Sequence, residues 1–294
     1  MRFPIILALL LILLAVTIVP FSQSVTSRPI AVKLGYTPDA AVIESIVGEH
    51  QYLAAQLTVS RVIFYYGTLV EKLNNRVSLQ PEYFNMYKTL ETAVKLDPYN
   101  LDAYYFAQAA FTWEINRIDD VNSMLKYGMK YRSWDYQLPF FIAFNSAYFK
   151  KDYPTAAKYM ARAAELSKQP LYGNLAARYF YDAGRTDLGL IFLDSLIQNE
   201  QNEKVKKIYQ VRKQALMAVR VLENAVSRYR EVHGVIPKEL SLLVKNRLLT
   251  EIPPDPYGGT FYIDPDGSIK STSKLAYPKT DKEGTNKGSH NERN

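Results

Sequence analysis

The stretch that decides the fold is AYFKKDYPTA, residues 147–156, which leads into a second apolar run that contains Ala163. An aromatic pair closes the first run, a turn follows, and Ala156 and Ala163 stand seven positions apart in the second run. A small residue on a second helix lets it approach the first helix, and an aromatic side chain fills the gap beside it. This spacing therefore predicts a pair of helices joined by a short turn.

The same organisation recurs along the chain. Apolar residues return at intervals of three and four, and no stretch between residues 40 and 233 alternates apolar and polar residues as a half-buried strand would. Self-similarity at a fixed period indicates a repeat architecture. We predict three helix pairs and a degenerate fourth pair that precedes them, with a long first helix. The three pairs cover residues 101–132, 138–168 and 172–200, and the degenerate pair has helices near 41–73 and 82–96.

Residues 93–104 read as the end of one pair and the start of the next, and a third copy with Gly184 in its turn and Gly189 at the small position spans 175–196. Over residues 80–200 the chain closely resembles the tetratricopeptide repeat family, although the turn within 147–156 is one residue short and lacks the usual glycine. The resemblance implies an α-solenoid over residues 40–200, because each pair leaves an apolar face that its neighbours must cover. It says little about the ligand, since packing residues define this family.

In such arrays the first helices line a concave groove, and the resemblance places aromatic and basic side chains there. This mixture would suit an extended or helical segment of a partner protein. The alternative is that several of these side chains only pack against the flanking helices. The residues expected to face the groove are Tyr105, Thr112, Trp113, Ile142, Phe149, Lys150, Asn174, Arg178, Tyr181 and Asp182.

The N-terminal segment, residues 1–24, is expected to be a membrane anchor or a signal peptide. Residues 3–21 carry no charge, which is close to the roughly 20 apolar residues that a spanning helix needs. Pro20 and the small residues near Ser24 favour cleavage instead. We expect a single-pass inner-membrane protein with its bulk in the periplasm, or a secreted protein cleaved near Ser24. The flanking charges do not decide the orientation.

A basic helix is predicted from residue 204 to residue 230, where eight basic residues accompany one acid, Glu223. Lys206, Lys213 and Arg220 recur every seven residues and form a predicted basic stripe. Such a stripe could contact anionic headgroups or an acidic partner. A solvated charged face explains it equally well. Nucleic acid is not expected as a partner, because no known reading motif accompanies the charges.

The chain changes character after Gly234. Residues 260–263 and 268–271 flank a Pro/Gly turn and predict a β-hairpin. The order of a long helix, the element Asp255-Pro256-Tyr257-Gly258 and paired strands resembles the globular end of type II secretion major pseudopilins. Residues 203–273 are therefore expected to form the basic helix and a small α+β cap, while the pilin leader and the rest of that sheet are missing. The polar residues 276–294 are expected to be disordered.

The sequence contains none of the common catalytic signatures: Gly-x-Ser-x-Gly, His-Glu-x-x-His, a Walker loop and Gly-x-Gly-x-x-Gly are all absent. The chain has no cysteine, and its three histidines are scattered. We therefore expect no enzyme, no cofactor and no metal site. The favoured reading is a mostly α, membrane-anchored extracytoplasmic scaffold that binds a partner protein during assembly of the envelope or a secretion system. The alternative is a secreted protein that binds glycan, associated with polysaccharide export.

Overall fold

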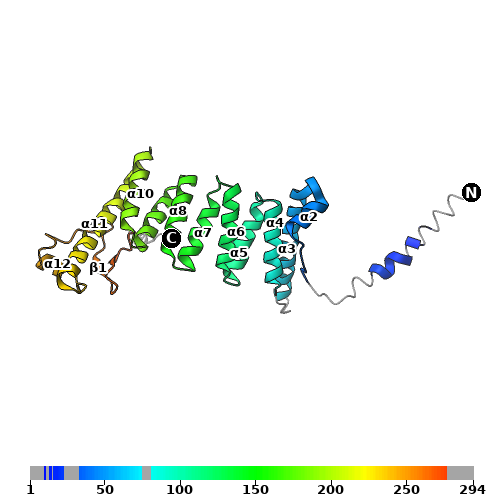
Figure 1. Cartoon of the computed structure of the whole chain (residues 1–294), viewed down its shortest axis with the longest axis horizontal. Helices are drawn as coiled ribbons and strands as arrows, with labels where there is room; N and C mark the ends of the chain where they lie inside the picture. The colour runs from blue at the N-terminus through cyan, green and yellow to red at the C-terminus, as the bar shows by residue number, and fades with distance from the viewer. Residues whose placement is uncertain (1–9, 11–12, 15, 23–32, 75–80, 277–294) are drawn as a thin grey trace, which may run out of the picture. The chain divides into compact units, whose positions relative to one another are not determined.

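The computed structural model describes residues 10, 13–14, 16–22, 33–74 and 81–276. The protein is mostly helical, with a small two-stranded antiparallel sheet near its C-terminal end (Figure 1). The chain divides into two compact units at the bond between Asp97 and Pro98. Each unit is described by itself.

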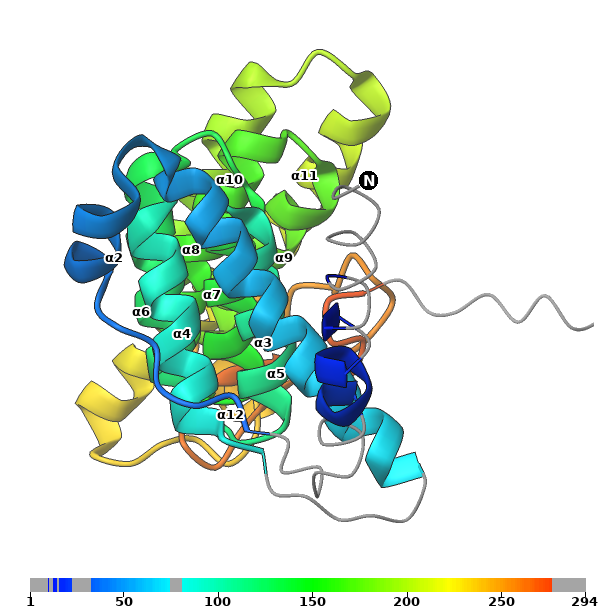
Figure 2. The same cartoon turned by 90° about the vertical axis from the view of Figure 1, so that its right-hand side faces the viewer.

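The first unit is built around two long helices, α3 and α4, which lie alongside each other (Figure 2). Sequence periodicity predicts one helix over 41–73, but the chain breaks at Gly48, whose φ of 56° suits glycine and few other residues. Helix α2 then packs against both α3 and α4, where Ala40, Ala55 and Leu96 form a small core. The elements are α2 (Ala40–Val47), a 3-10 turn η1 (Gly48–His50), α3 (Gln51–Asn74) and α4 (Tyr83–Leu96).

The predicted anchor and the possible cleavage site near Ser24 lie largely outside the described residues, which from this segment include a helical stretch at 16–22. Among the described residues, the stretch Ala40–Val70 is long and apolar enough to cross a membrane, with a mean hydropathy of 1.2. Length and composition alone set that criterion, and the core helix of a soluble protein also meets it. The predicted disordered tail beyond residue 276 lies outside the described residues.

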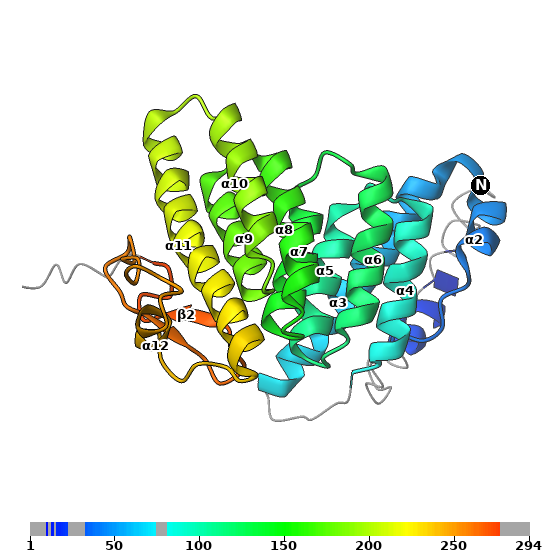
Figure 3. The same ribbon diagram turned by 60° about the vertical axis from the view of Figure 1, so that its left-hand side comes forward.

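In the second unit seven helices follow one another side by side in chain order (Figures 1 and 3). The turns between these helices fall where the sequence predicts them. Two of the turns end in a capping residue: Asn100 accepts a hydrogen bond from Ala103 N, and Asp152 accepts one from Thr155 N. The helices are α5 (Leu101–Trp113), α6 (Ile118–Tyr131), α7 (Gln137–Tyr148), α8 (Tyr153–Ser167), α9 (Pro170–Asp182), α10 (Thr186–Asn199) and α11 (Glu203–His233).

Small residues stand where the helices approach each other most closely. Ala156 and Ala163 are fully buried on α8, between helices α7 and α9. A Cβ atom at Gly189 on α10 would lie 3.2 Å from the Cβ atom of Phe180 on α9 and 3.0 Å from Leu216 Cδ1 on α11. The two alanines seven residues apart and the glycine at position 189 thus allow the helices to pack closely.

The C-terminal elements pack on α11, whose inner face carries Leu216, Val219 and Leu222. Strand β2 lies beside α11 (Figure 3), and the buried side chains of Phe261 and Ile269 join the same core. The hairpin predicted from sequence is present, with Phe261 opposite Ser271. These elements are α12 (Ser241–Lys245), β1 (Phe261–Ile263) and β2 (Ile269–Ser271).

The division of the chain differs from the one expected. The sequence groups residues 40–200 as one array and sets residues 203–273 apart, whereas the compact units meet at Asp97 and Pro98. Helix α11 packs along α10 and also contacts α9. The predicted basic helix therefore belongs to the same compact unit as the helix pairs that precede it.

Candidate functional site: an aromatic groove on α5 and α7

Aromatic side chains gather on one side of two alternate helices, α5 and α7. On α5, one face carries Tyr105, Ala109 and Trp113, which are four residues apart. On α7, one face carries Phe141, Phe144 and Tyr148, which are three and four residues apart. The side chains of Tyr105 and Trp113 are 62% and 56% exposed, which is unusual for residues of this size. They border an open hollow of about 300 Å³, which we call the aromatic groove. Its lining residues are Tyr105, Gln108, Ala109, Trp113, Phe140, Phe141 and Phe144.

The rings of the aromatic groove hold one another in place. The Trp113 ring centroid lies 5.0 Å from that of Phe149, in an edge-on arrangement, and 5.5 Å from that of Tyr148. Phe144 and Tyr148 stack with their centroids 5.3 Å apart and their planes 8° from parallel. Offset and edge-on aromatic pairs contribute about 0.5–1.5 kcal/mol each beyond the area that they bury. The exposed rings are therefore preorganised.

The floor of the groove is polar and rigid. The buried amides of Gln108 on α5 and Asn145 on α7 exchange two hydrogen bonds of 2.8 Å each. Asn145 also donates to the side-chain oxygen of Asn122 on α6 at 2.9 Å. Since a buried amide without partners costs free energy, this network fixes the register of three successive helices.

Two lysines stand at the end of the groove, in the turn after α7. Lys150 pairs with the carboxylate of Asp119 at the start of α6. The Lys151 ammonium lies 5.6 Å from the centroid of the Tyr148 ring. The aromatic groove thus has aromatic walls, a polar floor and the ammonium of Lys151 at one end, while the charge of Lys150 is balanced by Asp119.

The structure brings together some of the residues predicted for the groove. Tyr105 and Trp113 line the aromatic groove, and the ring of Phe149 packs edge-on against Trp113. Lys150 follows Phe149 in the chain. Ile142 and Thr112 do not line an open surface, because both side chains are buried, and the Thr112 hydroxyl bonds to the carbonyl oxygen of Gln108. The expectation that they face the groove is wrong.

The four remaining predicted residues lie on α9, and none of them lines the aromatic groove. Tyr181 is buried, and its hydroxyl donates to the carbonyl oxygen of Ile269 in β2 at 2.6 Å. Asp182 pairs with Arg178 at 3.6 Å, and Asn174 donates to the carbonyl oxygen of Pro170 at 3.2 Å. Tyr181 therefore serves the packing of the C-terminal hairpin and does not face an open groove.

Burial shifts the ionisation of the groups at this contact. It raises the pKa of the Tyr181 hydroxyl and the pKa of the Asp182 carboxyl, although Arg178 and Lys270 partly oppose the second shift. On α11, burial likewise raises the pKa of Glu223, against a hydrogen bond of 2.8 Å from the Thr186 hydroxyl. We find no reacting geometry here, because the hydroxyl of Tyr181 already donates to a backbone carbonyl oxygen.

The predicted basic stripe is neutralised along its length. Lys206 pairs with Glu203 at 3.4 Å, and Arg220 pairs with Glu223 at 3.8 Å. Lys213 pairs with Asp194 of α10. Each member of the stripe therefore has an acidic partner within the protein, and the favoured reading is a solvated face of balanced charge.

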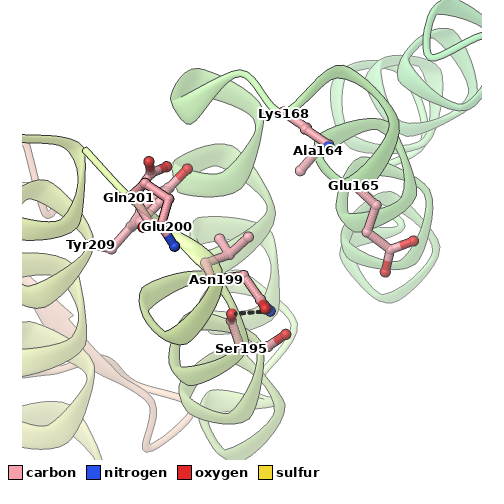
Figure 4. Close-up of a pocket in the computed structure, with 9 residues that line it drawn as sticks. Ala164, Glu165, Lys168, Ser195, Asn199, Glu200, Gln201 and Tyr209 are labelled. Carbon is pink, nitrogen blue, oxygen red and sulfur yellow. Dashed lines mark hydrogen bonds between the residues drawn. The ribbon is translucent and has the colours of Figure 1, made fainter.

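A larger hollow of about 680 Å³ opens where α8, α10 and α11 meet (Figure 4). Glu165 and Lys168 lie on one wall, and Glu200 and Tyr209 lie on the other. The Glu200 carboxylate accepts a hydrogen bond from Asn202 N at 2.8 Å, so it serves the turn between helices. Most of its lining residues are polar or charged, whereas small-molecule sites are lined predominantly by apolar and aromatic side chains.

Within the described ranges no group of three or more His, Asp or Glu side chains is placed to hold a metal ion. The half-buried Phe140, Phe141 and Phe144 and the exposed Tyr148 of α7 are the functional candidates that sequence reasoning missed. Residues 141, 144 and 148 share one helix face, but the apolar residues between them in the sequence mask this spacing. Comparisons with protein-family models, with curated proteins and with solved structures give no match.

Proposed function

We propose that this protein is a membrane-anchored, extracytoplasmic scaffold of tetratricopeptide type, in which the aromatic groove binds a segment of a partner protein during assembly of an envelope or secretion structure. One observation carries the proposal: large aromatic side chains, led by Tyr105 and Trp113, are held exposed on adjacent first helices. Buried side chains of these types dominate the energetics of protein interfaces.

The chemistry of the groove favours an apolar or amphipathic peptide. Its walls are aromatic, and the amide of its polar member, Gln108, is occupied by Asn145. An amphipathic helix places anchors at intervals of three and four, which matches the spacing of aromatic residues on α5 and α7. The ammonium of Lys151 at one end would favour a peptide with an acidic residue there.

The tethering part of the proposal rests on the uncharged run of residues 3–21. The solenoid part rests on the helix pairs and on the small residues between them. The C-terminal hairpin and α12 would close the end of the stack by covering α11.

The test uses the two tryptophans of the chain, Trp113 in the groove and Trp134 outside it. In a Trp134→Phe variant the emission of Trp113 alone reports on the groove. Titration with synthetic amphipathic helical peptides should shift this emission in a saturable manner, and Tyr105→Ala should abolish the shift. Peptides that bind equally well to the Tyr105→Ala variant would refute the groove as the binding surface.

A second candidate function is glycan binding, which a separate aromatic surface favours. The rings of Tyr99 and Trp134 stack with centroids 6.1 Å apart and planes 15° from parallel. Trp134 is 61% exposed, and the Arg132 guanidinium lies 5.8 Å from its ring centroid. A flat exposed ring suits the face of a sugar.

The two functions separate by mutation. Glycan binding should be lost in Trp134→Ala and kept in Trp113→Ala, whereas peptide binding should show the opposite pattern. A sugar array probed with these two variants distinguishes them. Saturable glycan binding together with a groove that accepts no peptide would favour the second candidate.

A further inference from the structure

The most exposed apolar surface outside the aromatic groove lies on α2 and α3. Ile46 on α2 is 77% exposed and Phe64 on α3 is 74% exposed, and Leu53 and Leu57 are about 60% exposed. Positions 53, 57, 60 and 64 follow the spacing of one helix face, and the polar member of that set, Ser60, carries no charge. We call Ile46, Leu53, Leu57 and Phe64 the outer apolar face.

Helix α3 is apolar on two opposite sides. Ala55, Val59 and Val62 are completely buried on the side that packs against α4. This double apolar character explains why the stretch Ala40–Val70 is apolar enough to cross a membrane. Because one side is committed to α4, the helix would contact lipid with the outer apolar face alone, and it would lie along a bilayer surface.

Three hydroxyls of this region are satisfied within the helices. The hydroxyls of Thr58 and Thr68 donate to the carbonyl oxygens of Ala54 and Phe64 at 2.7 and 2.8 Å. Ser45 does the same toward Val42 at 2.7 Å. Hydroxyls that return to the preceding turn need no bond from water, which suits a helix in contact with lipid.

Charge is almost absent from α3 between residues 51 and 70. Arg61 is the single charged residue in that range, and its guanidinium donates to the carbonyl oxygen of Leu34. Exposed tyrosines, Tyr52 at the start of α3 and Tyr36 before α2, accompany the apolar residues. Tyrosine is enriched where a membrane meets water, since its ring is apolar and its hydroxyl is polar.

The N-terminal apolar segment supplies the lipid surface. Residues 22–39 separate it from α2, and 18 residues span at most about 60 Å when fully extended. Thr17 in the helical stretch 16–22 donates to the carbonyl oxygens of Leu13 and Leu14, as the hydroxyls of α3 do within their own helix. An anchor in the bilayer therefore keeps the first unit within reach of the membrane.

We propose that the outer apolar face of α2 and α3 is a second membrane contact, which lies in the boundary between headgroups and acyl chains of the anchoring bilayer. This inference shares the membrane attachment of the proposed function and is independent of the aromatic groove. Its consequence is a first unit held flat against the lipid, where a tether alone would leave it free to swing.

The absence of cysteine allows a direct test. Leu57→Cys and Phe64→Cys in the full chain each provide one site for an environment-sensitive nitrobenzoxadiazole label. Each labelled protein is reconstituted into phosphatidylcholine and phosphatidylglycerol vesicles and exposed to lipid-borne doxyl quenchers or to aqueous iodide. Val232→Cys on α11, at an equally exposed apolar position, is the matched control.

Labels at residues 57 and 64 should emit at shorter wavelength, lose fluorescence to doxyl lipids and resist iodide, whereas the label at residue 232 should respond to iodide alone. Iodide quenching at 57 and 64 equal to that at 232 would overturn the proposal. Shielding from both quenchers would also overturn it, because a protein surface would then cover the face, and so would failure of the chain to float with the vesicles.

Each variant must keep the helical circular dichroism spectrum of the unaltered chain, and Leu53→Cys replaces any variant that does not. Peptide titration of the groove in the same samples keeps the two proposals apart. Loss of peptide binding with lipid contact intact refutes the proposed function alone, and the reverse result refutes the membrane contact alone.

Discussion

Gln108 and Asn145 face each other across α5 and α7 and exchange two hydrogen bonds at 2.8 Å, with both side chains buried. A primary amide offers one acceptor oxygen and one donor group, so this pair matches both in a single reciprocal contact. Asn122 accepts the remaining Asn145 proton at 2.9 Å. The pair fixes the spacing of the two helices that carry the aromatic groove.

Replacing Asn145 by Ala should destabilise the protein by about 3 kcal/mol or more, because it leaves both Gln108 and Asn122 buried without their shared partner. Urea unfolding followed by circular dichroism measures the change. Asn224→Ala, at an exposed position on α11, should stay within about 0.5 kcal/mol of the unaltered chain. The double variant Gln108→Leu/Asn145→Leu should lose less free energy of unfolding than the two single variants lose in sum. Additive losses would contradict a coupled pair.

Removing the indole of Trp113 should weaken binding of a groove peptide by about 2 kcal/mol, which is roughly 30-fold, since buried tryptophans are frequent hot spots. Isothermal titration of Trp113→Ala measures the loss. The same change at Trp134 should leave peptide affinity unaltered, because that ring stacks on Tyr99, outside the groove lining. Equal losses in the two variants would indicate a general effect on folding.

Acid should loosen the segment around Asp255. Burial alone would raise the pKa of this carboxyl, but hydrogen bonds from the Ser271 and Ser273 hydroxyls and from the Tyr257 amide outweigh it, so the pKa is lowered from 3.8. A native pKa below the unfolded one stabilises the fold above about pH 4, and this contribution is lost as the pH falls toward the native value.

In Asp255→Asn we expect a less stable protein at pH 7 whose stability declines less steeply below pH 4. Thermal unfolding between pH 2.5 and pH 7 follows both effects. An unchanged acid limb in the variant would show that other carboxyls set the acid sensitivity.

Asp182 and Glu223 should act with the opposite sign. Burial raises the pKa of both carboxyls above their ordinary values of 3.8 and 4.5, so the native state holds their protons more tightly than the unfolded chain does. Their contribution is fully present below the unfolded pKa values and is lost as the pH rises through the native ones.

The double variant Asp182→Asn/Glu223→Gln should therefore lose less stability than the unaltered chain as the pH rises from 4 to 7. Unfolding in urea at a series of pH values measures this slope, and Glu114→Gln at an exposed site serves as the control. A steeper slope in the double variant would mean that their pairing with Arg178 and Arg220 outweighs burial.

The helix pairs were predictable because turns with capping residues and small packing positions recur along the sequence. The break at Gly48 was missed, although a glycine followed by the polar residues 49–51 is a signal for the end of a helix. Ile142 was misplaced because nearly every position of residues 138–149 is apolar, so the pattern does not tell the inner face of α7 from the outer one. The same ambiguity hid the role of Phe141 and Phe144.

Tyr181 on α9 was misplaced for a different reason. The Tyr181 hydroxyl donates to the backbone of Ile269, which is 88 positions further along the chain, and no local sequence pattern predicts such a distant contact. The ion pairs of Lys213 and Arg220 likewise involve the neighbouring helix or an adjacent turn, so a basic stripe read from sequence overstates the free positive charge.

The bond from Tyr181 to the backbone of Ile269 and the bond from Arg212 to the carbonyl oxygen of Leu275, at 2.6 Å each, have a consequence for the order of synthesis. Helices α5 to α10 can pack as they leave the ribosome, but the part of α11 that the C-terminal elements cover stays open until residues 261–275 have emerged. A nascent chain stalled before that point would display the uncovered core of α11 to chaperones and proteases. Its final stretch thus seals the second unit, and interrupted products would be removed.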